Sequence, residues 1–198
     1  PRLRAAAASY GGLVRLHFHS RGAISNLFVE PQPELAAPGQ LETQLRVRAV
    51  GLNFRDVLNV LGEYPGDPGP PGGDAAGVVR AAGDLPAAED ERSLGLAHAP
   101  LACLARASTL LLVRQPAALS FEEACTLPVT WSTTHAALER AGLQSGGSMV
   151  VQAAAGGVGL KAAECAQWLL AAVVGTAGRP HKHAQLRGVG MIELCSSH

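Results

Sequence analysis

The sequence has few aromatic residues, no excess of charge and no long apolar run, and each shortage excludes a class of protein. Only 4% of its 198 residues are aromatic, and sixteen basic residues are balanced by sixteen acidic ones. Without a basic excess, neither nucleic acid nor an anionic membrane is expected as the main partner. No apolar run reaches the roughly 18 residues that a membrane-spanning helix needs, so we expect no such helix.

Closely spaced cysteines are also missing. The four cysteines, at positions 103, 125, 165 and 195, include no pair with the spacing of a zinc site, so no metal is expected. We interpret them as buried, reduced thiols of a cytoplasmic protein. The chain starts at Pro1 and has no apolar leader, and we interpret its first residues as a cut from a longer polypeptide.

The periodicity of apolar residues divides the chain into two parts. Up to residue 126 short alternating stretches predict strands between loops rich in Pro and Gly, with one helix over 54–61. Ser120 followed by Glu123 is typical of a helix start. Strands are then predicted at 148–152, 172–177 and 190–195, and helices at 158–170 and 181–188. This order indicates a parallel sheet, so we expect an α/β chain with domains at 1–126 and 127–198.

The stretch VVQAAAGGVGLKAAECAQW, residues 150–168, predicts a strand, a turn of small residues and a helix. Residues 154–159 match the pattern G-x-G-x-x-G with Ala154 in place of the first glycine. Small residues let a pyrophosphate approach the backbone, and the amides that open the helix favour its charge. In this helix Val158 and Ala162 are predicted on the apolar face and Lys161 on the polar face. A tight turn without a ligand remains the alternative.

The residues after the second predicted strand favour NADPH over NADH. An NAD-binding unit places an acidic residue about 20 positions after the glycine pattern, where it bonds the ribose. No acidic residue lies between Glu164 and Glu193, whereas Arg179 and Lys182 follow the strand. Both cations can pair with a 2′-phosphate. A solvated basic helix start is the alternative.

Several stretches together resemble one family. LNFRDVL with YPG, LSFEEACTLPVTWSTTHAAL and AAAGGVG occur in the order found in zinc-independent medium-chain reductases. The chain is most similar to the enoylreductase domains of polyketide and fatty acid synthases, and quinone oxidoreductases are near relatives. The resemblance implies a GroES-like β-rich domain followed by a Rossmann domain, with NADPH between them.

The resemblance also implies a reaction and its residues. Hydride passes from NADPH to a trans-2-enoyl thioester carried on an acyl carrier protein, and a proton follows. Tyr64 matches a proton donor, although a tyrosine that packs the neighbouring loop is an equal alternative. Asn53 matches a residue near the nicotinamide, or caps the helix over 54–61. The remaining matches are Thr133 in the cofactor cleft, Gly156, Gly157, Val158 and Gly159 at the pyrophosphate, and Lys182, Ser197 and His198 at the 2′-phosphate.

Three hypotheses follow for the function. The first is an NADPH-dependent enoyl reductase domain that works with an acyl carrier protein and neighbouring synthase domains, with a homodimer through the parent synthase left open. The second is a separate NADPH:quinone or enone oxidoreductase. The third is a truncated, non-catalytic domain, because only three of the six strands of a Rossmann sheet precede His198 and Asp74 replaces the family's glutamate.

Overall fold

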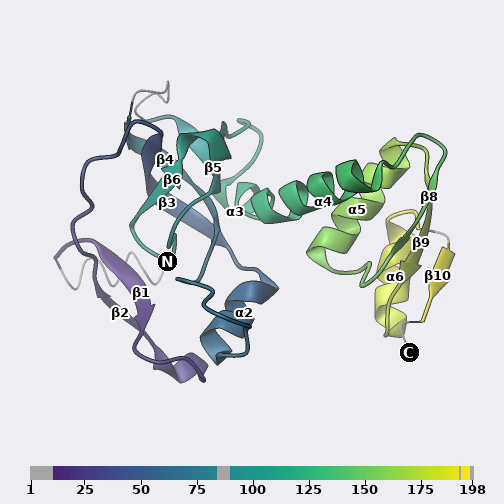
Figure 1. Cartoon of the computed structure of the whole chain (residues 1–198), viewed down its shortest axis with the longest axis horizontal. Helices are drawn as coiled ribbons and strands as arrows, with labels where there is room; N and C mark the ends of the chain where they lie inside the picture. Colours follow the sequence, from purple (N-terminus) through teal and green to yellow (C-terminus); the bar gives the residue numbers. More distant parts are fainter. Residues whose placement is uncertain (1–10, 84–89, 192, 197–198) are drawn as a thin grey trace. The chain divides into compact units, whose positions relative to one another are not determined.

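The computed structural model describes residues 11–83, 90–191 and 193–196. The chain divides into two compact units, Pro1–Val129 and Thr130–His198 (Figure 1). The domain boundary expected between residues 126 and 127 stays a prediction. Within the described ranges, none of the helices is both long and apolar enough to cross a membrane.

The first unit is built mainly from antiparallel strands. A two-stranded sheet pairs β1 (Val14–Phe18) with β2 (Leu27–Pro31). A five-stranded antiparallel sheet has the order β6-β3-β4-β5-β7. Its strands are β3 (Glu42–Gly51), β4 (Asp74–Ala82), β5 (Arg92–Leu96), β6 (Leu104–Ser108) and β7 (Leu112–Arg114). One side of this sheet buries Leu45, Val79 and Ala107, and Ala76 and Leu94 pack against α3 (Phe121–Ala124). The predicted β-rich part is therefore confirmed.

The expected capping box before α3 is confirmed. The backbone amide of Glu123 donates to Ser120 Oγ at 3.1 Å, and the amide of Ser120 donates to Glu123 Oε2 at 2.8 Å. These bonds satisfy two amides that the first helical turn leaves unpaired.

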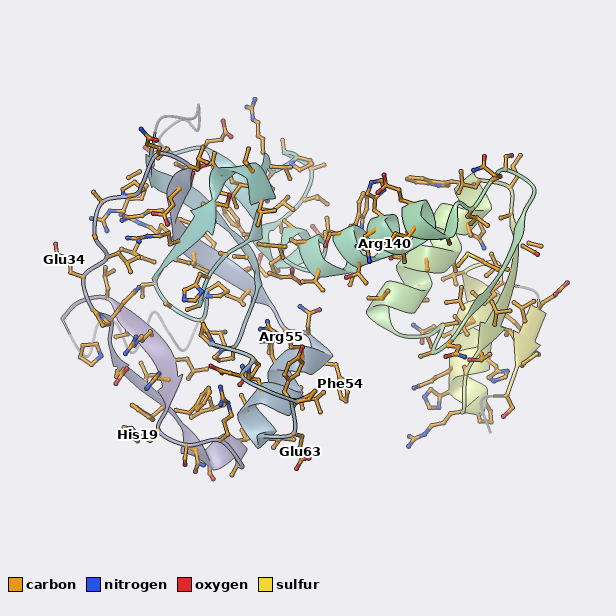
Figure 2. The ribbon with its side chains drawn as sticks, in the orientation of Figure 1. His19, Glu34, Phe54, Arg55, Glu63 and Arg140 are labelled. Atoms are coloured by element: carbon orange, nitrogen blue, oxygen red, sulfur yellow. The ribbon has the colours of Figure 1, made fainter. Side chains whose placement is uncertain are left out.

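The helix α2 (Phe54–Leu61) has its polar side buried and its apolar side exposed. Phe54 keeps 74% of its surface exposed on this helix (Figure 2), whereas Asp56 and Asn59 are buried. Asp56 accepts a hydrogen bond from the amide of Gly72 at 2.7 Å, and Asn59 donates to the carbonyl of Gly69 at 3.0 Å. The polar side of α2 is buried because it binds the backbone of the loop over residues 62–73, which has few side chains of its own.

The second unit is the predicted strand–helix repeat. The long helix α4 (Pro128–Ala141) leads into β8 (Ser148–Val151), α5 (Gly157–Trp168), β9 (Ala172–Thr176), α6 (Pro180–Gly188) and β10 (Glu193–Cys195). The three strands form a parallel sheet in the order β10-β9-β8, and α5 and α6 lie beside it (Figure 1). The core between them contains Val151, Ala163, Leu186 and Met191. The predicted parallel α/β arrangement is confirmed.

The prediction of which side of α5 is buried was wrong. The buried residues are Gly159, Lys161, Ala163 and Ala166, whereas Val158 is 38% exposed. Small residues face the sheet because they let the helix backbone approach it closely, so the larger side chains lie at the edge.

Lys161 was predicted to face solvent, and it is buried. Its ammonium lies 3.6 Å from the centre of the Trp131 ring and 3.1 Å from Glu164 Oε2. The indole of α4 covers the cation, and the carboxylate keeps it paired. An intrahelical pattern could not reveal this, because Trp131 belongs to a different helix.

Candidate cofactor site

The turn between β8 and α5 brings the first residues of the helix very close to the backbone that precedes it. Gly156 caps α5, and its carbonyl accepts the amide of Leu160 at 2.8 Å. A β-carbon placed on Gly159 would lie 2.6 Å from the carbonyl oxygen of Ala153 and 2.7 Å from Ala154 Cα. Only glycine allows the helix to pass this close to the turn. Alanine is accepted at position 154 because this residue lies in the core, whereas Ala153 carries the positive φ of 50°.

A pocket of about 730 Å³ opens at this turn. The turn, the end of β9 and the start of α6 contribute its lining residues, which are Gln152, Ala153, Ala155, Gly156, Thr176, Ala177, Gly178, Lys182 and Ser196. Among these described residues one is a cation and none is acidic. The pocket therefore combines helix amides with a single ammonium group, which suits a phosphorylated ligand and leaves a ribose without a carboxylate partner.

The first unit contains two of the predicted residues, Asn53 and Tyr64. Asn53 lies at the N-cap position of α2, where its backbone amide donates to Asp56 Oδ2 at 2.8 Å, and its expected contact with the nicotinamide stays a prediction. The side chain of Asn53 donates to Asp74 Oδ2 at 2.9 Å. Tyr64 is half-buried in the loop that α2 holds, and the Arg55 guanidinium lies 5.7 Å from the centre of the Tyr64 ring.

Asp74 is a residue whose importance the sequence analysis missed. The residue is 1% exposed, and its carboxylate accepts a hydrogen bond from the Asn53 side chain through Oδ2 and one from the backbone amide of Val129 through Oδ1 at 2.8 Å. Burial raises the pKa of Asp74, although its two donors act in the opposite direction. In the sequence Asp74 stands out only as a departure from the family, because its hydrogen bonds reach distant residues that no local pattern connects.

Some of the predicted cofactor residues lie at the pocket and others do not. Gly156 and Lys182 line the pocket, and Gly157, Val158 and Gly159 form the first turn of α5. Arg179 caps α6 and is exposed, and it is absent from the lining of the pocket in the described residues. Thr133 is exposed on α4. Ser197 and His198 lie outside the described residues, so their predicted contact with the 2′-phosphate stays a prediction.

The expectation of four buried thiols was wrong for three of them. All four cysteines are free, but only Cys125 is buried, and Cys195 at the end of the short strand β10 is exposed. Burial, followed by the nearby Asp74 carboxylate, raises the pKa of the Cys125 thiol. Within the described residues, no cluster of His, Cys, Asp and Glu is large enough to hold a metal ion.

Comparisons with known proteins identify the family. No family model matches the chain. The chain is 43% identical over 174 residues to erythronolide synthase EryA2 of Saccharopolyspora erythraea, a match that covers 86% of this chain and 5% of that protein. Its structure matches the CurK enoyl reductase with a TM-score of 0.87 and 33% identity, over 94% of this chain and 60% of that chain.

A third match is a solved structure that contains a cofactor. The Escherichia coli quinone oxidoreductase complexed with NADPH matches with a TM-score of 0.77 and 28% identity, over 91% of this chain and 57% of that chain. The chain thus spans about 60% of the length of the solved enoyl reductase and a small part of the curated synthase. With its α/β fold and these relatives, the chain belongs to the enoylreductase-like medium-chain oxidoreductases, a group that includes domains of polyketide synthases.

Proposed function

We propose that the chain binds NADPH and takes part in the reduction of trans-2-enoyl thioesters on an acyl carrier protein, within a polyketide or fatty acid synthase. The observation that carries the proposal is the pocket at the start of α5, where glycine backbone and Lys182 occur without a carboxylate in the described lining. The neighbouring synthase domains of the relatives support this context, and the NADPH of the quinone oxidoreductase supports the choice of cofactor.

The residues of the pocket fit the phosphate groups of NADPH. The amides that open α5 would bind the pyrophosphate, and Gly159 permits the close approach of helix and turn. Lys182 would pair with the 2′-phosphate, and we keep Arg179 as a second cation that can reach it from the start of α6. Bound NADPH supplies the hydride.

In the first unit, Tyr64 is the residue that would donate the proton. The loop of Tyr64 is held by α2 through Asp56, Asn59 and Arg55, whose guanidinium donates to the carbonyl of Pro68. A phenol on a fixed loop can be held for proton transfer at the α-carbon of the reduced thioester. Asn53 and Thr133 are proposed to contact the cofactor, and a buried Asp74 keeps the Asn53 side chain oriented.

The cofactor choice can be tested by binding. Calorimetry should show tighter binding of NADPH than of NADH, because only NADPH carries the 2′-phosphate. Lys182→Gln should weaken the binding of NADPH about tenfold and leave that of NADH unchanged, since one charge-assisted pair is lost. Arg187→Gln, at the other end of α6, serves as the control and should change neither constant. Equal affinity of the wild-type chain for the two cofactors would overturn the proposal.

The substrate can be tested separately. We expect NADPH oxidation with crotonyl thioester as the acceptor. Tyr64→Phe should lower the rate of this reaction by about a hundredfold without weakening the binding of NADPH. Reduction of a quinone in place of the thioester would favour the second candidate, a quinone oxidoreductase, to which the structural match with the E. coli enzyme points. NADPH binding without turnover of either acceptor would favour the non-catalytic domain.

A further inference from the structure

Three arginines of the large sheet line one pocket, and the proposed function uses none of them. Arg46 and Arg48 of β3 and Arg80 of β4 line a pocket of about 250 Å³ together with Val78, Val79 and Asp90. We call it the bulge pocket. All three arginines belong to the first unit, whereas Lys182 and the turn between β8 and α5 belong to the second.

Two of these arginines are the extra residues of β-bulges. Along the β3–β4 ladder, Val47 pairs with Gly77 and Ala49 with Ala76, so Arg48 is left over on β3. Gln44 pairs with Ala81 and Leu45 with Val79, so Arg80 is left over on β4. A bulge leaves one residue outside the ladder and changes the direction of its side chain, a device common beside binding sites. The two interruptions of this ladder thus fall at two arginines of one pocket.

The charge of the bulge pocket is not compensated within the part of the chain that the structure describes. Arg15, Arg21, Arg106 and Lys161 each form an ion pair with a carboxylate. For Arg46, Arg48 and Arg80 no such pair occurs among the described residues, and Asp90 is the acidic residue in the lining. Since the protein has no net charge, three gathered guanidinium groups with one carboxylate are a local excess of positive charge, and an anion would relieve their repulsion.

We propose that the bulge pocket binds a phosphate group. Guanidinium groups bind phosphate through paired hydrogen bonds in a fixed plane, and three of them around one small pocket match its several oxygens. Counted over the described lining, three arginines and Asp90 leave an excess of two positive charges, which matches a phosphate dianion better than a single carboxylate. The phosphate can be free or esterified, and this proposal is independent of the proposed function.

Calorimetric titration of the full 198-residue chain tests the proposal, in a phosphate-free buffer of low ionic strength. The probes are inorganic phosphate, glycerol 3-phosphate as a monoester and dimethyl phosphate as a diester, with succinate at matched charge as the carboxylate control. Saturable binding of at least one phosphate probe, tighter than that of succinate, is expected. The ranking of the three phosphate probes distinguishes a free ion from an ester.

Variants locate the site. Arg48→Gln and Arg80→Gln should each lower the affinity for phosphate about tenfold, whereas Arg114→Gln on β7 should leave this affinity unchanged. Lys182→Gln removes the cation that lines the proposed cofactor pocket, and it should leave phosphate binding at the bulge pocket intact. Asp90→Asn should tighten it about threefold by removing a repulsive charge, and asparagine accepts the positive φ of 63° at this position. Arginine Nε–H resonances that move with the titration in the wild-type chain provide a second readout.

The proposal is overturned if no phosphate probe binds saturably, or if succinate binds as tightly as phosphate. It is also overturned if binding survives Arg48→Gln and Arg80→Gln but is lost in Lys182→Gln. That last result would place the phosphate in the cofactor pocket and would leave the proposed function standing.

Discussion

At the scale of single residues, Asp74 shows how a buried carboxylate changes stability with pH. The side chain links Asn53 at the start of α2 with Val129 in α4, and it has almost no contact with solvent. Loss of hydration disfavours its charged form, so the pKa in the folded chain lies above the ordinary value of 3.8. The folded state therefore binds this proton more tightly than the unfolded state.

The pH dependence of unfolding tests this shift. Because the folded pKa of Asp74 is raised, its contribution is fully present below pH 3.8 and is lost as the pH rises through the folded pKa. The free energy of unfolding of the wild type, relative to Asp74→Asn, should thus fall as the pH rises from about 3.8. Urea unfolding of both proteins at a series of pH values measures the difference.

Asp67 is a control of opposite sign for this experiment. The amide of Gly69 and then the Arg21 side chain lower the pKa of Asp67 below 3.8, so its contribution is present above that pH and is lost as the pH falls. Relative to Asp67→Asn, the wild type should therefore gain stability as the pH rises toward 3.8. Parallel pH profiles for the wild type and Asp74→Asn would contradict the assignment.

Leu170 has a backbone conformation whose strain can be tested by substitution. It follows α5 with a φ of 54°, which lies in the left-handed region that favours glycine. A left-handed conformation costs a leucine about 1–2 kcal/mol, and its side chain is also 79% exposed. We expect Leu170→Gly to raise the free energy of unfolding by about 0.5–1 kcal/mol, after the larger chain entropy of unfolded glycine is subtracted.

The neighbouring residue provides the comparison. Leu169 has a right-handed φ of −80°, so Leu169→Gly relieves no strain and should destabilise the chain. Thermal unfolding of the two variants should therefore show shifts of opposite sign. A loss of stability in both would mean that the contacts of Leu170 outweigh its strain.

At the scale of elements, α2 is the helix for which pattern and packing disagree. A strong apolar side at Phe54 and Val57 correctly predicts a helix, yet the side that is buried carries Asp56 and Asn59. The loop over residues 62–73 is rich in Pro and Gly, and it offers carbonyl and amide groups for burial in place of apolar side chains. A helix against such a loop is stabilised by polar partners.

Two substitutions in α2 separate the pattern from the packing. Asn59→Ala should lower the free energy of unfolding by about 1–3 kcal/mol, because it removes the hydrogen bonds of the buried Asn59 side chain to the Gly69 carbonyl and to Arg21 Nε. Val57→Ala, on the exposed side, should change it by less than about 0.5 kcal/mol. Urea unfolding compares the two, and the reverse order would show that the apolar side is the one that stabilises the helix.

At the scale of the whole molecule, the exposed apolar side chains stand out. In the second unit, Trp131, Val150, Trp168 and Leu170 are all exposed, and both tryptophans of the chain are among them. The two tryptophans line a groove between α4 and α5 of about 580 Å³, together with Leu138 and Leu143. A surface of this kind lowers its free energy by contact with another apolar surface.

Self-association is therefore expected of the 198-residue chain in solution. Sedimentation velocity should show a weight-average coefficient that rises with protein concentration, because burial of the groove removes apolar area from water. Trp168→Gln should reduce this rise, and Arg187→Gln, an exposed change on α6, should leave it unaltered. A concentration-independent monomer would show that the groove is stable in water.

By itself, the sequence determined the local structure of this protein. Local sequence is enough to predict the strands and helices, the capping box at Ser120 and the turn of small residues between β8 and α5. The alternation of strands and helices in turn predicts the parallel sheet. The resemblance to enoylreductases rests on the same short stretches. These features were predictable because backbone propensity, capping and side-chain period act over one or two turns of chain.

Only the tertiary structure decided which sides of those elements are buried. The ammonium of Lys161 is buried under Trp131, thirty positions earlier in the chain. Asp74 accepts hydrogen bonds from Asn53 and Val129. Two shifts in the register between β3 and β4 leave Arg48 and Arg80 of the bulge pocket outside the ladder. Each of these outcomes depends on contacts between distant segments, and the energy of burying a group is set by those contacts and not by its neighbours in sequence.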